Sequence, residues 1–217
     1  MANIQIGAAA GTTLGNPPSG DFYIFIDSDN VNAYTLRDSS GMDTILGSAN
    51  PATLYGLYSQ TVQSATITNT VTETSIIGSG VGSLTVPADF FTVGDSYHGK
   101  VGGVISAQNG DDITIRIKTG ATVLASTGAI TLSPVTALGW ELELDFTIAA
   151  IGATGTICTN GNFAYNRDTG SLEGFVFQDV QAIDTTSANT LDITVEWGQA
   201  KTQDQIYSAN FVLYKTY

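Results

Sequence analysis

The sequence is poor in charged residues, and above all in basic ones. Only 12% of its 217 residues are charged, with seven Lys and Arg against twenty Asp and Glu, which gives a net charge of −13. Proteins that bind nucleic acids neutralise phosphates with clustered Lys and Arg, and here these residues are scattered. The composition disfavours a nucleic-acid partner. It indicates a surface of neutral Thr, Ser, Asn and Gly, or one partly hidden in subunit contacts.

Cysteine and histidine are almost absent. Cys158 is the only cysteine and His98 the only histidine, which excludes an intrachain disulfide and a standard zinc site within one chain. A catalytic triad needs a base, and the serine nearest to His98, Ser96, is too close in sequence to indicate a nucleophile. We interpret His98 as a hydrogen-bonded surface or interface residue and Cys158 as a small buried apolar residue. No metal and no cofactor is expected.

Long apolar runs and targeting signals are also lacking. No run approaches the roughly 20 apolar residues that cross a bilayer, so membrane insertion is not expected. The N-terminus has neither the basic region nor the apolar core of a signal peptide. The simplest interpretation is a protein made in the cytoplasm and used without the secretory pathway.

The most regular feature of the sequence is the alternation of apolar and polar residues that is typical of β-strands. Residues 140–148 alternate between an apolar face that begins with Trp140 and an acidic face of Glu141, Glu143 and Asp145, and residues 191–197 alternate in the same way up to Trp197. No stretch shows sustained helical periodicity. Regular strand spacing with turn signals predicts an all-β fold, an antiparallel jelly-roll sandwich over residues 58–217. Both tryptophans are expected in its core.

Particular strands can be assigned within this region. Gly99, Gly102 and Gly103 indicate bulges or close backbone approach in their strand. The last strand is expected to be a central or interface strand that holds Phe211, Leu213 and Tyr217 in the sheet. The predicted strands span residues 62–68, 71–77, 84–86, 97–107, 112–119, 122–126, 140–148, 154–165, 172–181, 191–197 and 209–217.

The first 57 residues have a different character. Residues 1–20 are small, uncharged and flexible, which is typical of a disordered tail or of a docking peptide that becomes ordered against a larger structure. Residues 21–46 alternate as two short strands that form a hairpin, which is marginal alone and therefore needs a partner. Residues 47–57 are predicted to be a linker, with a module boundary near residue 57.

Residues 27–38 fail the ligand pattern of an EF-hand loop, so a polar turn is expected at Asp27. The carboxylates of Glu141 and Glu143 have a spacing workable for glycoside hydrolysis. We interpret them instead as a solvated strand face paired with Arg116 and Lys118, and no enzymatic activity is expected. The residues best suited to contact a glycan are Tyr97, Tyr165, Arg167 and Tyr207.

Two stretches of the chain resemble trimeric virion fibres of bacteriophages and other viruses. Residues 17–27, which begin Pro-Pro-Ser-Gly, and residues 34–41, which end Arg-Asp-Ser-Ser-Gly, are similar to a short repeat near the N-terminus of many phage fibres. Residues 84–91 and 113–117 are similar to the opening strands of the tumour-necrosis-factor-like jelly rolls of such fibres.

The resemblance implies a non-enzymatic structural protein, a homotrimeric head or tail fibre, located in the virion and exposed to the host surface. It further implies that an N-terminal peptide attaches the trimer to a capsid or tail protein. The residues expected to dock there are Ile4, Ile6, Leu14, Pro17 and Pro18. The alternative is a lectin-like carbohydrate-binding module that has no anchoring role.

Overall fold

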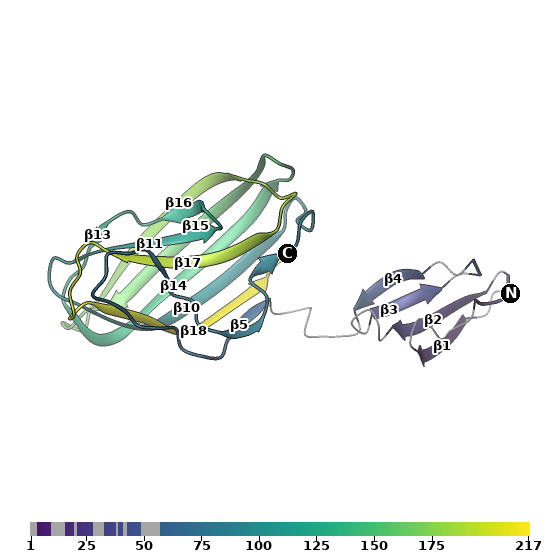
Figure 1. The fold of residues 1–217 in the computed structure, drawn as a ribbon, viewed down its shortest axis with the longest axis horizontal. Helices are drawn as coiled ribbons and strands as arrows, with labels where there is room; N and C mark the ends of the chain where they lie inside the picture. The colour runs from purple at the N-terminus through teal and green to yellow at the C-terminus, as the bar shows by residue number, and fades with distance from the viewer. Residues whose placement is uncertain are drawn as a thin grey trace. The chain divides into compact units, whose positions relative to one another are not determined.

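The structure is a computed structural model that describes residues 4–9, 16–19, 21–27, 33–37, 39–40, 43–48 and 57–217. The chain divides into two compact units, Met1–Tyr55 and Gly56–Tyr217. All regular secondary structure in the described ranges is β-strand (Figure 1), which confirms the predicted all-β class. The described ranges contain no helix long and apolar enough to span a membrane.

The first unit contains a four-stranded sheet in the order β1-β2-β3-β4. Its strands are β1 (Ile4–Ala9), β2 (Phe22–Asp27), β3 (Ala33–Arg37) and β4 (Asp43–Ser48). The expected hairpin corresponds to the antiparallel pair β2–β3.

Within the segment expected to be a disordered tail or a docking peptide, β1 pairs with β2 in parallel, with Ile4 opposite Phe22. Ile4 and Ile6 carry the period-two pattern of a strand. The connection of about a dozen residues to β2 is long enough for parallel pairing.

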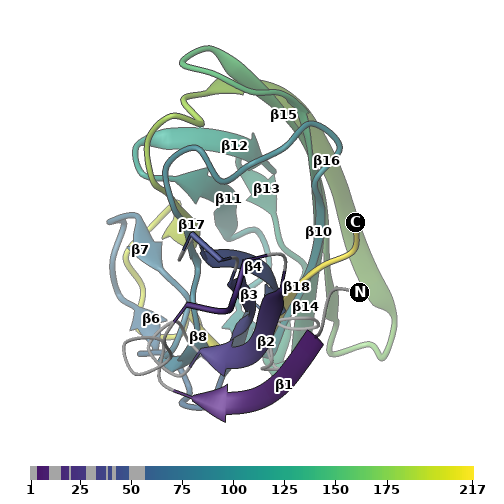
Figure 2. The ribbon, with the colours of Figure 1, turned by 90° about the vertical axis from the view of Figure 1, so that its right-hand side faces the viewer.

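The second unit is a sandwich of two antiparallel sheets, seen edge-on in Figure 2. The eight-stranded sheet has the order β16 (Leu172–Ile183), β15 (Gly155–Asn166), β14 (Val135–Ala150), β10 (Ser96–Ala107), β18 (Gln205–Lys215), β5 (Tyr58–Gln60) and β8 (Gly80–Gly82), with β6 (Ile67–Thr68) beside β18. The six-stranded sheet has the order β12 (Thr122–Ser126), β11 (Asp112–Thr119), β17 (Asn189–Trp197) and β7 (Thr74–Ser75). In addition, β13 (Ile130–Thr131) pairs with β11 and β9 (Thr85–Val86) with β17.

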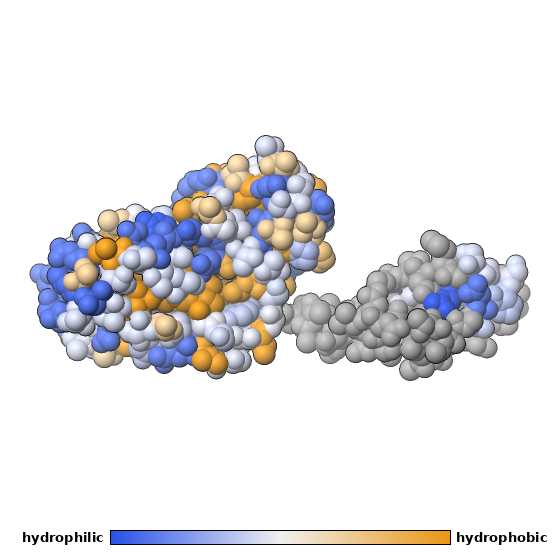
Figure 3. Space-filling view, in the orientation of Figure 1, coloured by the Kyte–Doolittle hydropathy of each residue, from blue (hydrophilic) through white to orange (hydrophobic). Residues whose placement is uncertain are grey.

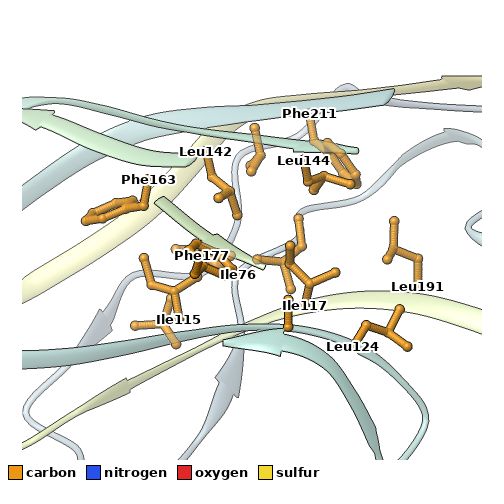
Figure 4. Packing of buried hydrophobic residues seen from close by; sticks show 14 of the residues in the cluster. Ile76, Ile115, Ile117, Leu124, Leu142, Leu144, Phe163, Phe177, Leu191 and Phe211 are labelled. Carbon is orange, nitrogen blue, oxygen red and sulfur yellow. The ribbon is translucent and has the colours of Figure 1, made fainter. Parts of the chain in front are cut away.

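The core lies between the two sheets (Figure 4). Alternate residues of β14 from Trp140 to Ile148, and of β17 from Leu191 to Trp197, are buried there, which confirms both predicted apolar faces and the core position of both tryptophans. Each fully buried aliphatic side chain contributes about 1.5–3 kcal/mol. Side chains labelled in Figure 4 come from both layers, among them Leu142, Leu144 and Phe211 from one sheet and Ile115 and Ile117 from the other.

The glycines of β10 allow close backbone approach, as the sequence predicted. A Cβ atom on Gly103 would lie 2.0 Å from the carbonyl oxygen of Tyr207, and the pairing of β10 with β18 shifts register between Gly102 and Gly103. A Cβ atom on Gly99 would meet Leu144 at 3.1 Å. These glycines therefore allow β10 to lie close to residues of both of its neighbours, β14 and β18.

Most of the predicted strands in the second unit are confirmed, but two are not. Residues 62–68 and 71–77 contribute only the two-residue strands β6 and β7. The reason is that this segment crosses between the layers, since β6 pairs with β18 and β7 with β17. A segment that leaves one sheet for the other cannot form a long ladder in either.

The last strand is central, because β18 lies between β10 and β5, and this confirms the prediction. Phe211 and Leu213 are buried as expected, but Tyr217 is 82% exposed and lies beyond the end of β18. Cys158, expected to be buried, is exposed. It alternates with Ile157 and Thr159, which point into the core, so the thiol lies on the outer face.

Candidate functional site

The outer face of the eight-stranded sheet contains a shallow groove. Alternation along each strand sends one set of side chains into the core and the other set outward. The groove has a volume of about 540 Å³ and is lined by His98, Lys100, Gly102 and Gly103 of β10, Trp140 and Glu141 of β14, and Ala209, Asn210, Val212 and Tyr214 of β18. Gly102 presents no side chain, which leaves the middle of the groove open.

Charged side chains from two neighbouring strands pair beside this groove. His98 Nδ1 lies 2.7 Å from Asp145 Oδ1, and Lys100 Nζ lies 2.9 Å from Glu141 Oε2 and 3.0 Å from Glu143 Oε1. Hydrogen bonds to Glu141 and Glu143 raise the pKa of Lys100. The ring of His98 also lies 5.2 Å from that of Tyr214, so the prediction of a hydrogen-bonded histidine is confirmed.

The expected partners of the acidic strand face were wrong. Arg116 and Lys118 belong to the other sheet, where Arg116 Nη1 lies 2.7 Å from Glu196 Oε2 and Lys118 Nζ lies 2.6 Å from Glu73 Oε1. The acidic face belongs to β14, and β14 pairs with β10 and β15. The sequence showed that these strands alternate, but not which strands are neighbours.

Two of the four expected glycan contacts are buried, which corrects the sequence-based expectation for them. Tyr97 is 3% exposed and stacks on Phe146 at 4.8 Å. Tyr165 is fully buried, and its hydroxyl donates to Glu173 Oε2 at 2.6 Å. Burial, followed by that hydrogen bond, raises the pKa of Tyr165 to about 12. Neither phenol presents a surface to a ligand.

The other two expected contacts, Arg167 and Tyr207, are half-buried, and β14 and β10 lie between β15, which Arg167 follows, and β18, which contains Tyr207. Arg167 donates to Ser171 Oγ at 3.0 Å and to Ser133 Oγ at 3.2 Å. The carbonyl of Tyr207 accepts the indole N–H of Trp140 at 3.1 Å. The four residues therefore do not form one site.

A second outward surface lies on β15 and β16, and we name it the neutral face. Its cross-strand pairs include Asn162 with Val176 and Cys158 with Val180. It consists of Thr156, Cys158, Asn160, Asn162, Ala164 and Asn166 on β15 and of Leu172, Gly174, Val176, Gln178, Val180 and Ala182 on β16. None of these twelve residues is charged.

Aliphatic side chains on the neutral face are unusually exposed. Leu172 is 68% exposed, Val176 81% and Val180 60%. On the face of the sandwich visible in Figure 3, hydrophobic residues also reach the surface between hydrophilic ones. The sequence carried the signal for the neutral face, since alternate residues of 156–166 and 172–182 are uncharged, but strand prediction alone did not show that these two sets share a face.

The residues expected to dock to a virion lie in the first unit. Ile4 and Ile6 belong to β1, Pro17 is buried and Pro18 exposed. Leu14 lies outside the described residues, as does the turn after Asp27. Within the described ranges, no group of three or more His, Cys, Asp or Glu residues could hold a metal ion.

Comparison with known proteins gave no relative. No family model matches the chain. No curated protein and no solved structure matches it either.

Proposed function

We propose that the chain is a non-enzymatic structural protein of a virion, the subunit of a trimeric head or tail fibre. The observation that carries this proposal is the order of its two units. A small separate sheet, whose first strand contains the docking residues Ile4 and Ile6, precedes a β-sandwich of 162 residues, Gly56–Tyr217. This order supports an attachment module followed by an exposed domain, as the resemblance to virion fibres implies.

The path of the chain through the sandwich supports a jelly roll of the tumour-necrosis-factor-like type. From β10 in the eight-stranded sheet the chain passes to β11 and β12 in the six-stranded sheet and returns in β14 to β16. It then crosses again to β17 and returns in β18. Strands distant in sequence thus become neighbours, as when β18 pairs with both β10 and β5, and such crossovers are typical of jelly rolls.

The lectin-like alternative is not proposed. Two of the four residues selected for it, Tyr97 and Tyr165, are buried. The remaining two, Arg167, which follows β15, and Tyr207 of β18, are separated by β14 and β10.

The anchoring role can be tested in the virus that encodes the chain. Residues 1–20 are deleted, and purified particles are probed with an antibody against residues 56–217. We expect the full chain on wild-type particles and none on particles of the deletion virus, because β1 and the docking residues are lost. The sandwich should still fold, since its core lies entirely within the second unit.

Two results would contradict the proposal. One is the absence of the full chain from wild-type particles. The other is incorporation of the deleted chain at the wild-type level. Circular dichroism of the purified deletion protein serves as the control for folding.

A further inference from the structure

We propose that copies of this chain associate through the neutral face of β15 and β16. The occupant of this face is a second copy of the same chain. The proposal rests on the self-association that the proposed function requires, and it names the surface that performs it.

The charge of the chain favours this face over the rest of the surface. Each copy carries a net charge of −13, so two copies repel one another unless the surfaces in contact are neutral or complementary. The outer face of the six-stranded sheet contains the ion pairs of Arg116, Lys118, Glu73 and Glu196. The twelve residues of the neutral face contain no charge at all, so identical copies meet there with the least repulsion.

The chemistry of the neutral face matches the centre of a protein interface. Such centres are depleted of charge and are well packed. Here three aliphatic side chains stand between amides that can donate and accept hydrogen bonds, those of Asn160, Asn162 and Gln178. Burial of apolar surface contributes about 25 cal/mol per Å², and Val176, which is 81% exposed, has the largest exposed fraction among these aliphatic residues.

The size of the neutral face indicates that it is the centre of the contact and not all of it. Two strands of 12 residues each cover roughly 40 Å by 10 Å, or about 400 Å². A partner in a standard interface contributes about 800 Å². A hollow of about 310 Å³ at one end of the face extends it toward β14, because its lining adds Gly139, Trp140 and Glu141 to residues of the face. Glu141 is the one charged residue of this hollow, and it is paired with Lys100.

The edge of β16 indicates that the contact uses the face of the sheet and not the addition of a strand. β16 is the last strand of its sheet, and unprotected edges invite strand pairing. The N–H of Val180 donates to Asp179 Oδ1 at 2.8 Å, and Gln181 Nε2 donates to Asp179 Oδ2 at 2.7 Å. Asp179 therefore occupies one backbone N–H in the middle of this edge, which a second strand would need in order to continue the ladder.

Charge also disfavours a basic partner at this face. A basic protein would be attracted to the acidic residues Glu141, Glu143 and Asp145 on β14, which lie next to the neutral face on β15. A surface without charge gives such a partner no advantage. Three copies of the same chain can turn their neutral faces toward a common threefold axis, where each face meets those of both neighbours.

The test combines a charged substitution with a native reporter. Val176→Asp places a carboxylate at the centre of the face, and Val176→Thr keeps the shape without charge. Val93→Asp is the matched control, because Val93 is 61% exposed in a turn outside the neutral face. Oligomeric mass is measured by light scattering at micromolar concentration. Alkylation of Cys158, the only cysteine, reports whether the face is covered.

We expect the wild type, Val176→Thr and Val93→Asp to be oligomers and Val176→Asp to be a monomer with unchanged circular dichroism. Cys158 should react on the order of tenfold faster in Val176→Asp, because its thiol becomes accessible. If Val176→Asp is still an oligomer and Cys158 is equally reactive in all proteins, the copies do not associate through the neutral face. The fibre proposal would remain intact. A monomeric wild type would overturn both self-association and the trimer. A monomeric wild type with protected Cys158 would also show that the chain itself covers the face.

Discussion

At the scale of single residues, a buried carboxylate stands out. Asp204 is 1% exposed, and neither of its oxygens has a hydrogen-bond partner among the described residues. The nearby Asp111 is also buried and is bound by Lys201. Burial, followed by the neighbouring Asp111 carboxyl, raises the pKa of Asp204 from 3.8 to about 6. A charged Asp204 therefore destabilises the folded protein.

We predict that Asp204→Asn stabilises the protein at pH 8. Because the folded pKa lies above the unfolded value, the folded state binds the extra proton, and stability rises as the pH falls from about 6 to about 4. The neutral amide removes this dependence. The expected gain in the free energy of unfolding is about 1–3 kcal/mol at pH 8 and close to zero at pH 4, as measured by urea unfolding.

The matched control for this substitution is Asp89→Asn. Asp89 is exposed and has a φ of 60°, a conformation that Asn tolerates well, so the variant has the same change of charge without the burial. We expect little change in its stability at either pH. A loss of stability in Asp204→Asn at pH 8 would show that the carboxylate has a stabilising partner, such as a bound water or cation.

At the scale of elements, a buried hydrogen-bond network fastens the irregular segment 61–79 to the sandwich. Ser208 of β18 is fully buried, and its Oγ donates to the carbonyl of Ile76 at 2.6 Å. Gln60 Nε2 donates to Ser208 Oγ at 3.0 Å, and Ser208 N donates to Ser64 Oγ at 2.9 Å. This network holds a segment that has only two short strands of its own.

We predict that Ser208→Ala destabilises the protein by about 1–3 kcal/mol, because it leaves the buried groups of Gln60 and Ile76 without their partner. Amide hydrogen exchange should accelerate in residues 61–79 more than in β14 or β15, because the network no longer fastens this segment. Ser59→Ala, an exposed position on the neighbouring strand β5, is the control and should change neither quantity. Uniform acceleration across the sandwich would refute a local role of the network.

The difference between long regular strands and the irregular segment 61–79 explains which elements could be predicted from the sequence. Long strands such as β14 and β17 were predictable because burial of one face imposes alternation. Residues 62–77 were not predictable in this way, because a network of side chains from β5 and β18 holds them. Ser208 of β18, which binds the carbonyl of Ile76, lies 132 residues away in the sequence. For the candidate site, alternation identified the acidic face of β14. It did not show that β10 supplies the cations, because strand neighbours depend on the topology.

At the scale of the whole molecule, charge and assembly are linked. The chain has a net charge of −13, and its neutral face is the surface on which like-charged copies can meet. Composition alone predicted that low charge reflects subunit contacts or a neutral polar surface. Only the pairing of β15 with β16 shows that uncharged residues from two strands form one continuous face.

We predict that salt strengthens association of the full chain. The Debye length is about 10 Å at 0.1 M and 3 Å at 1 M ionic strength, so added NaCl screens the repulsion between the copies while leaving a neutral contact unchanged. Light scattering over a dilution series should show tighter association in about 0.5 M than in about 0.02 M NaCl. Val93→Asp should respond at least as strongly, because it adds a negative charge outside the contact. Weaker association at high salt would indicate instead that ion pairs hold the copies together, which would place the contact at the groove with Lys100 and Glu141.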